Sequence, residues 1–313
     1  MSGASNTANH HRPETAVKPP RKFLGFNVTL DWFTRPLFGF GLAALAIAST
    51  YYGGYWFALF ITAGAVTAAR EWHRMLPGTQ YGWLSVASAL AIAGCAGTAV
   101  FFTRSADVHL AWIPWGVLAA GALVNLILSS PRRGAMLWHA SSMLYIGVPA
   151  LCLVVIRQVP ANGIWELLAL FFAVWATDTG ALFTGNLVKG PKLWPALSPN
   201  KTWSVAIGGA IAGMGATAVL FFVLASNPWH GALVGLCASV IGQFGDLFES
   251  FLKRKVGRKD SGSLIPGHGG VLDRIDSMLF VAPVAAAMFL ALHVGPFALG
   301  ASWVGPIFLP SQP

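Results

Sequence analysis

Charge is scarce in this chain of 313 residues, because only 10% of the residues are Asp, Glu, Lys or Arg. Soluble domains carry about 25% charged residues, so this sequence cannot cover a soluble surface of its size. Acidic residues are the scarcest, with 11 against 20 basic ones. The composition excludes an ordinary soluble enzyme, a disordered chain, a collagen and a coiled coil. With 55% apolar residues, 13 Trp and 21 Phe, it predicts a polytopic membrane protein.

Cysteine is also rare, and the three cysteines lack the CxxC or Cys/His spacing that metal sites use. Cys95, Cys152 and Cys237 each lie in an apolar stretch, which indicates helix packing. A GxxxxGK[ST] phosphate-binding motif is absent as well. Gly209 and Gly213 form a small-xxx-small pair within an apolar run, which favours close approach of two helices.

Nine apolar stretches approach the length of about 20 residues that an α-helix needs to cross a bilayer. Backbone in lipid must satisfy its own hydrogen bonds, so helices are expected rather than strands. The sequence therefore predicts an all-α, polytopic integral membrane protein with about nine transmembrane helices. The break between the first two stretches, at 51–54, is the least distinct. The stretches are about 36–52, 54–69, 83–103, 109–129, 136–156, 164–185, 203–225, 230–250 and 277–296.

The basic residues predict the orientation of the chain. If the N-terminus is cytoplasmic, eighteen of the 20 lysines and arginines fall on the cytoplasmic side, and only Arg104 and Arg157 lie outside. Cytoplasmic loops of membrane proteins carry this excess of Lys and Arg. Residues 1–22 are polar and lack the apolar core of a signal peptide, so a flexible cytosolic tail is expected. We predict a multi-pass protein of a bacterial inner membrane with a cytoplasmic N-terminus.

The few acidic residues concentrate in or beside apolar helices of the C-terminal half. A carboxylate at the bilayer centre costs about 2.5–3.5 kcal/mol on insertion scales, so several of them require a polar cavity. For Asp178 or Glu249 alone, snorkelling into water is an equally good interpretation. One face of the helix over 242–253 carries only small and polar residues, and this face is expected to point inward: Gly242, Asp246, Glu249, Ser250 and Lys253. The opposite face carries Phe244, Leu247, Phe248 and Phe251.

The next helix begins with Asp273, Asp276 and Ser277 on one face, so two helices offer carboxylates at the same membrane surface. Mg²⁺ typically takes one or two carboxylates together with substrate phosphates. Few histidines lie nearby, which argues against zinc. Between the helices, 253–272 is basic and then rich in glycine. Glycines allow backbone N–H groups to close on an anion at a helix N-terminus.

A third element, Ser198-Pro199-Asn200-Lys201-Thr202-Trp203, precedes an apolar stretch on the cytosolic side. Lys201 can reach a phosphate there, although an interfacial anchor is the alternative role. The basic run after 252 could likewise be a patch attracted to anionic lipid. Carboxylates for a metal, cations for phosphate and a glycine turn together favour phosphoryl or nucleotidyl transfer.

At this point the sequence resembles a known family, the phosphatidate cytidylyltransferases or CDP-diacylglycerol synthases. The residues that carry the resemblance are Ser250-Phe251-Leu252-Lys253-Arg254, Lys259-Asp260 and the run from Pro266-Gly267-His268-Gly269-Gly270 to Asp273-Arg274-Ile275-Asp276. The blocks Trp175-Ala176-Thr177-Asp178-Thr179-Gly180-Ala181 and 198–203 add to it. The resemblance is clear over about 140–290 and weaker before, apart from Glu71-Trp72. Two places depart from the family pattern: Ser204-Val205 stands where Glu-Gly is usual, and Leu182 where Tyr is common.

The resemblance implies that CTP and phosphatidate react to CDP-diacylglycerol and pyrophosphate in phospholipid biosynthesis. It implies Mg²⁺ as cofactor, with K⁺ alongside it in some members, no nucleic acid, and a homodimer. It divides the chain into a flexible cytosolic tail at 1–30, N-terminal transmembrane helices at 31–160, a C-terminal transmembrane catalytic region at 161–300 and a tail at 301–313. Asp246 and Asp273 would hold the metal.

Further roles follow from the same pattern. The expected catalytic residues are Asp246, Asp273, Asp276, Lys201 and Lys253. The expected substrate-binding residues are Asp178, Ser198, Ser250, Arg254, Lys259, His268 and Arg274. Two other functions fit parts of the pattern: a CTP-dependent lipid kinase or a cytidylyltransferase for another lipid phosphate, and an ion transporter, since intramembrane acids also serve ion passage. The gathering of charge at one membrane face argues against transport.

Overall fold

The computed structural model describes residues 21–23, 26–28, 31–76, 81–105, 110, 112–131, 133–158, 163–262, 264 and 269–293, and the described chain is almost entirely helical. Two short antiparallel hairpins are the exceptions: β1 (Arg21–Phe23) with β2 (Phe26–Val28), and β3 (Lys192–Trp194) with β4 (Ser198–Thr202). The α-helices are α1 (Asp31–Tyr52), α2 (Gly54–Met75), α3 (Tyr81–Ser105), α4 (Ile113–Leu128), α5 (Met136–Ser142), α6 (Val148–Gln158), α7 (Gly163–Leu187), α8 (Trp203–Val223), α9 (Pro228–Lys255) and α10 (Leu272–His293). A 3₁₀ turn (Arg133–Ala135) precedes α5, and a π-helical turn (Met143–Gly147) joins α5 to α6.

Each predicted apolar stretch corresponds to one helical segment, when α5, the π turn and α6 are counted as a single continuous segment. Within the described residues, five segments are long and apolar enough to cross a membrane: Gly82–Phe102, Met136–Gln158, Gly163–Leu187, Trp203–Val223 and Pro228–Lys255. Two further apolar helices are shorter, Gly39–Tyr52 and Ile113–Leu128. The all-α, multi-pass membrane architecture is confirmed, whereas nine crossings stays a prediction.

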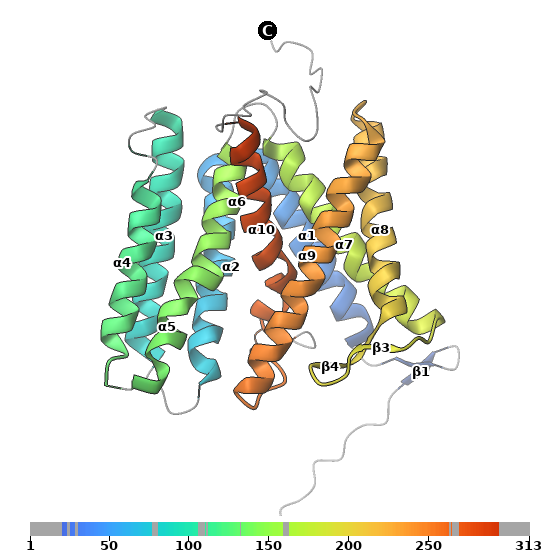
Figure 1. Ribbon diagram of the computed structural model, residues 1–313, viewed down its shortest axis with the longest axis horizontal. Coiled ribbons are helices and arrows are strands. Elements are labelled where there is room, and N and C mark those ends of the chain that lie inside the picture. The colour runs from blue at the N-terminus through green and yellow to red at the C-terminus, as the bar shows by residue number, and fades with distance from the viewer. Residues whose placement is uncertain are drawn as a thin grey trace, which may run out of the picture.

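The helices form a bundle in which α10 lies between two packed groups (Figure 1). On one side α3 and α4 pack together, and on the other side α7, α8 and α9 pack together. Helix α10 contributes Val281 and Ala282 to the core that contains α7, and Leu272 and Leu279 to the core that contains α2 and α3. Helix α10 therefore packs mainly against α9 on one side and α6 on the other, and so joins the two cores.

The break between α1 and α2 falls at Gly53, within the predicted boundary. Gly53 and Gly54 have φ angles of 62° and 52°, which glycine adopts without the steric cost that a side chain brings. Arg157 at the end of α6 donates from Nε to the carbonyl oxygen of Thr50 at 2.6 Å and from Nη2 to that of Tyr51 at 3.2 Å. A cation at a helix C-terminus is favourable, so Arg157 fixes this turn.

Glycines allow α7, α8 and α9 to pack backbone to backbone. A Cβ atom on Gly213 would lie 2.6 Å from Thr177 Oγ1, and one on Gly209 would lie 2.9 Å from the carbonyl oxygen of Thr177. On the other side of α8, a Cβ atom on Gly235 would collide with Thr217 Oγ1 and the carbonyl oxygen of Gly213. The close helix packing predicted from the Gly209 and Gly213 pair is confirmed.

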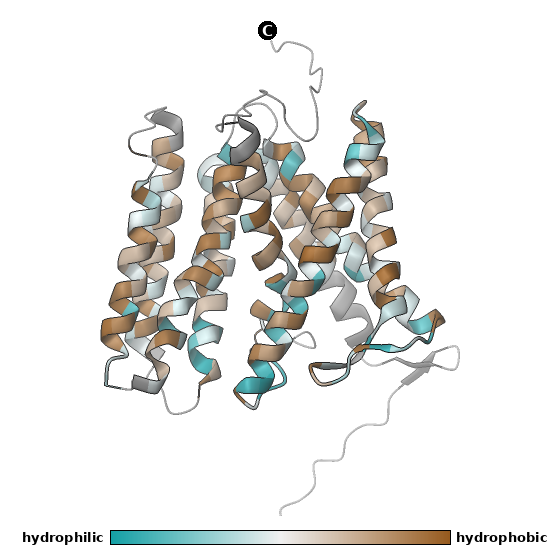
Figure 2. Ribbon diagram, in the orientation of Figure 1, coloured by the Kyte–Doolittle hydropathy of each residue, from teal (hydrophilic) through white to brown (hydrophobic). Residues whose placement is uncertain are grey.

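Polar residues gather at one end of this apolar bundle, at the ends of α2 and α9 and in the β3–β4 hairpin (Figure 2). On α9, Phe244, Phe248 and Phe251 are exposed on the outer face, as predicted. Leu247 was expected among them and is buried instead, because α9 packs against α7, α8 and α10 and its inward face is correspondingly wide. Cys95 and Cys152 are buried, whereas Cys237 is exposed, so the packing interpretation is wrong for Cys237.

The glycine contacts predict opposite effects of one substitution at two sites. Gly235→Ala should lower the melting temperature in detergent, since overpacking a tight contact costs about 1–3 kcal/mol. Gly215→Ala in α8 is the matched control, because a Cβ atom there meets nothing within 4 Å. It should leave the melting temperature unchanged or raise it, as alanine favours helices by about 1 kcal/mol over glycine. Equal melting of the two variants would contradict the packing described.

Candidate active site

Two lysine–carboxylate pairs lie at the polar end of the bundle. Lys201 Nζ lies 2.7 Å from Asp246 Oδ2, which connects the start of α8 to α9. Lys253 Nζ lies 2.7 Å from Asp273 Oδ1 and 3.2 Å from Glu249 Oε2, which connects α9 to α10. The side chains of Lys253 and Asp273 are 13% and 9% exposed, so this pair is largely shielded from solvent, whereas Lys201 is 10% exposed and its partner Asp246 is 43% exposed.

The local sequence explains why Lys201 reaches α9. Strand β4 ends at Thr202, whose hydroxyl caps α8 by accepting the N–H of Val205 at 3.3 Å. Hydroxyl residues favour this position because they satisfy an N–H group that a helix start leaves unpaired. Lys201, one residue earlier, also donates to the carbonyl oxygen of Gln243 at 3.4 Å. The hairpin and the helix cap thus place its ammonium group over α9.

The carboxyl groups of Glu249 and Asp276 lie between the two pairs. Glu249 is 0% exposed, and its Oε1 atom has no hydrogen-bond partner among the described residues. The carboxyl groups of Glu249 and Asp276 interact directly, and Asp246 lies within electrostatic range of Asp276. Burying such a group without a partner is costly. This oxygen, between α9 and α10, is an acceptor that a cation could bind.

Asp246 and Asp273, the predicted metal ligands, are each paired with a different lysine. Each accepts its own lysine, and Lys253, which holds Asp273, is seven residues or about 10 Å along the helix from Asp246. Glu249 and Asp276 lie between them. Asp246 and Asp273 therefore belong to two separate ion pairs, and the carboxyl groups of Glu249 and Asp276 connect these ion pairs.

Backbone N–H groups before α10 hold Asp273 from the other side. Ser261 N lies 3.1 Å from each of its carboxylate oxygens, and Gly270 N lies 2.8 Å from Oδ2. The next two N–H groups, of Val271 and Leu272, bind the carboxylate of Glu71 at 3.0 and 2.9 Å. The glycine turn was expected to bind an anion with such groups. In this structure the described N–H groups of 270–272 bind protein carboxylates instead.

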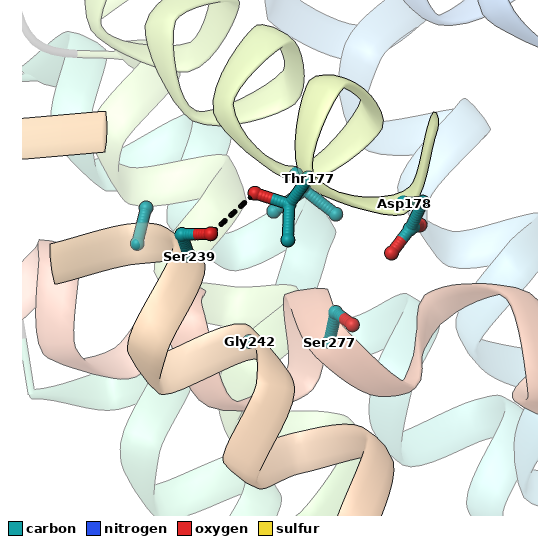
Figure 3. A pocket seen from close by; sticks show the side chains of 7 residues that line it. Thr177, Asp178, Ser239, Gly242 and Ser277 are labelled. Atoms are coloured by element: carbon teal, nitrogen blue, oxygen red, sulfur yellow. Dashed lines mark hydrogen bonds between the residues drawn. The ribbon is translucent and has the colours of Figure 1, made fainter. Parts of the chain in front are cut away.

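Asp178 lines a small pocket beside these charges, together with Thr177, Ser239, Gly242 and Ser277 (Figure 3). The hydroxyls of Thr177 and Ser239 are hydrogen-bonded at 2.6 Å and join α7 to α9. Asp178 lies within electrostatic range of Asp246 and Lys201. The pocket therefore continues the charged site into the bundle.

The structure gathers some predicted site residues and leaves others at the rim. Lys201, Asp246, Lys253, Asp273 and Asp276 are brought together. Ser250 is half-buried on the same face of α9, and Ser198 lies in β4 opposite Trp194. The exposed basic residues at the rim are Arg254, Lys259 and Arg274. His268 lies outside the described residues. Sequence reasoning noticed Glu249 but gave it no role, and it missed Glu71, for which the only signal was the Glu71-Trp72 resemblance.

The carboxylate oxygens at this site are the type of ligand that a hard divalent cation prefers. Asp246, Glu249 and Asp276 offer only oxygen ligands, and one of these oxygens is the orphaned Oε1 of Glu249. Within the described part of the chain, no three His, Cys, Asp or Glu side chains are already grouped around one metal position. A cation that takes two carboxylates and completes its shell with phosphate oxygens and water, as Mg²⁺ does, needs no such preformed group.

The cytidylyltransferase family model matches residues 33–292. The chain belongs to the cytidylyltransferase family. Proteins named phosphatidate cytidylyltransferase from Brucella suis and Brucella abortus are each 37% identical to it over 275 residues, which cover 85% of this chain and 94% of theirs. A protein of the same name from Staphylococcus haemolyticus is 43% identical over 153 residues, 48% of this chain and 58% of its own.

Family membership confirms the resemblance and the prediction of a nucleotidyltransferase. The match covers more of the chain than the motifs indicated, because it includes the N-terminal helices. Of the departures from the family pattern, Leu182 is 66% exposed on α7. Ser204 bonds the hydroxyl of Thr202 at 2.8 Å and donates to the carbonyl oxygen of Val188 at 3.1 Å, so it ties α8 to the end of α7.

Lys253 is paired with both Glu249 and Asp273, and this gives the first prediction for the site. Lys253→Met should lower the melting temperature strongly, since removing one partner of a buried ion pair costs about 3–5 kcal/mol and here leaves Glu249 and Asp273 without their cation. Lys255→Met, an exposed lysine two residues further on α9, is the control and should melt like the wild type. Similar melting of both variants in detergent would show that Lys253 does not hold the two helices.

Proposed function

We propose that this protein transfers the cytidylyl group of CTP to phosphatidate and releases pyrophosphate, giving CDP-diacylglycerol. Family membership and relatives named phosphatidate cytidylyltransferase support the reaction class and both substrates. The observation that carries the proposal is the pairing of Lys201 with Asp246 and of Lys253 with Asp273 at one end of an apolar bundle. Cations and carboxylates lie there within reach of a lipid headgroup.

The reaction needs charge neutralisation more than it needs a base. An oxygen of the lipid phosphate forms a bond to the α-phosphorus of CTP, and the bond from that phosphorus to the bridging oxygen of the β-phosphate breaks. The electron pair leaves with pyrophosphate. The attacking oxygen is already ionised at neutral pH, so catalysis consists of positioning two anions and offsetting their charge.

Lys201 and Lys253 are suited to bind the phosphates. Each ammonium group has three N–H donors, and Lys201 makes one strong bond, to Asp246, beside a longer contact to Gln243. It can therefore bind a phosphate without leaving its carboxylate. The exposed residues Arg254, Lys259 and Arg274 add positive charge at the rim, where a triphosphate enters.

Mg²⁺ is the cofactor we propose, with K⁺ as a possible second cation of this family. Two carboxylates would hold the divalent ion, drawn from Asp246, Glu249, Asp276 and, once it is released from Lys253, Asp273. The bound ion would withdraw charge from the α-phosphate and from the departing pyrophosphate. The residues themselves orient the two phosphates and keep the site rigid.

The location of the site suits a lipid substrate. The outer face of α9 carries exposed phenylalanines one turn or less from the carboxylates, so acyl chains can stay in the bilayer while the headgroup reaches the lysines. Because CTP is a cytoplasmic nucleotide, this end of the bundle would face the cytoplasm, in agreement with the distribution of Lys and Arg. We propose the bacterial inner membrane as its location, and a homodimer stays a prediction.

Radiolabelled CTP distinguishes cytidylyl transfer from its alternatives. With purified protein, Mg²⁺ and phosphatidate in mixed micelles, label in the α-phosphate of CTP should enter the lipid fraction and label in the γ-phosphate should appear in pyrophosphate. A lipid kinase would give the reverse, with γ label in lipid and α label in CDP. Ion flux through liposomes without nucleotide turnover would favour a transporter instead.

Asp273→Asn should strongly lower the rate of CDP-diacylglycerol formation, to a residual rate that can still be measured, while the protein remains folded. The amide keeps one oxygen acceptor for Gly270 or Ser261, but it removes the charge that pairs with Lys253. The measurement is the rate of lipid labelling from α-labelled CTP, alongside size-exclusion behaviour in detergent. Asp107→Asn, in the loop that the sequence places on the opposite membrane side, is the control and should retain activity. A wild-type rate in Asp273→Asn would remove Asp273 from the site.

A further inference from the structure

Glu71 connects the N-terminal helices to the loop before α10. Its side chain, at the end of α2, belongs to a residue that is only 6% exposed. Oε1 accepts the N–H of Val271 at 3.0 Å, and Oε2 accepts the N–H of Leu272 at 2.9 Å and the hydroxyl of Ser261 at 3.3 Å. These partners lie 190 to 201 residues away along the chain. A carboxylate from one half of the protein thus caps a helix of the other half.

The loop closes tightly around this carboxylate. A Cβ atom on Gly262 would lie 2.6 Å from Glu71 Oε1, and one on Gly270 would collide with Glu71 Oε2 and Ser261 Oγ. The chain can pass this close to Glu71 only because Gly262 and Gly270 have no side chains. Gly262 and Gly270, which follow the basic run, therefore have a steric reason that is independent of substrate.

The same loop residues hold Asp273. Ser261 donates its N–H to Asp273 and its hydroxyl to Glu71. Gly270 donates its N–H to Asp273, and its α-carbon packs against Glu71. Two carboxylates thus bind the loop from opposite sides. If Glu71 is lost, the donors that fix Asp273 lose their support.

The end of α2 is a rigid platform for Glu71. The indole rings of the adjacent Trp72 and of Trp138 stack with centroids 4.4 Å apart and planes 13° apart. Each indole N–H donates to the backbone carbonyl of the other residue, at 2.8 and 3.1 Å. The next pair, His73 and His139, is buried and has Nδ1 atoms 3.0 Å apart. Two consecutive cross-links to α5 thus fix the direction in which Glu71 points.

We propose that Glu71 is a positioning residue, which holds the loop and the first turn of α10 so that Asp273 and Lys253 stay in their working arrangement. Its carboxylate satisfies two N–H groups at a helix N-terminus, where negative charge is favourable. The expected effect on kcat rests on the proposed function. The structural effect, which is the protection of loop amides from hydrogen exchange, does not depend on which reaction the site performs.

The test is Glu71→Gln in the full-length protein. Glutamine has the same length but offers one oxygen and one NH₂ group, so one of the two N–H groups would face a donor instead of an acceptor. Hydrogen–deuterium exchange at the amides of Val271 and Leu272 should become at least about tenfold faster. The kcat for CDP-diacylglycerol should fall about 10–100-fold, as for residues that orient metal ligands, while the KM for CTP changes less than about threefold.

Two further variants keep the test decisive. Ser261→Ala removes one hydroxyl donor to Glu71 and leaves the N–H bonds, so it should raise exchange at Leu272 only about two- to threefold and serves if Glu71→Gln does not fold. Glu166→Gln removes another buried glutamate, in the first turn of α7, and is the matched control. It should leave exchange at both amides and kcat within about twofold of the wild type.

The outcomes separate this inference from the proposed function. Wild-type exchange in both Glu71→Gln and Ser261→Ala would overturn the positioning role, and so would equal acceleration by Glu166→Gln. Faster exchange with an unchanged kcat would also overturn it, because the loop would then be loosened without consequence for the site. A wild-type protein that forms no CDP-diacylglycerol would refute the proposed function alone, and the exchange measurements would still decide whether Glu71 holds the loop.

Discussion

The site depends on carboxylates that cations and N–H donors hold in place at the end of an apolar bundle. Removing a carboxylate from water is costly, and the cost is offset when a cation or several N–H donors bind it. Lys253 meets this requirement for Glu249 and Asp273 at once, and so fixes the distance between α9 and α10. Lys201 does the same for Asp246 from the start of α8. The packing of three helices and the chemistry of the site therefore share the same ion pairs.

The two halves of the chain contribute unequally to the site but both are needed. The paired lysines and aspartates come from β4, α9 and α10. The N-terminal half supplies Glu71, whose orientation is fixed by the tryptophan pair between α2 and α5. The family match likewise includes the N-terminal helices, among them the one that carries Glu71.

Most of the fold could be predicted from the sequence, because a bilayer demands long apolar helices and each of these leaves a visible run. The outward face of α9 was predictable from Phe244, Phe248 and Phe251, since residues on one side of a helix recur at fixed spacing. Leu247 was not, because its burial depends on how many neighbours surround α9. Asp246 and Asp273 were identifiable from motifs. Their separate lysine partners and the contact of Glu71 were not, since these depend on distances between segments far apart in the chain.

A double-mutant cycle tests most directly whether Lys253 and Asp273 act as one unit. Residues that work together lose activity non-additively when both are replaced. The account predicts that Lys253→Met combined with Asp273→Asn forms CDP-diacylglycerol no more slowly than the worse single variant, with kcat/KM as the readout. If the losses of the two single variants multiplied in the double variant, the two residues would act independently and the ion pair would not be the basis of the site.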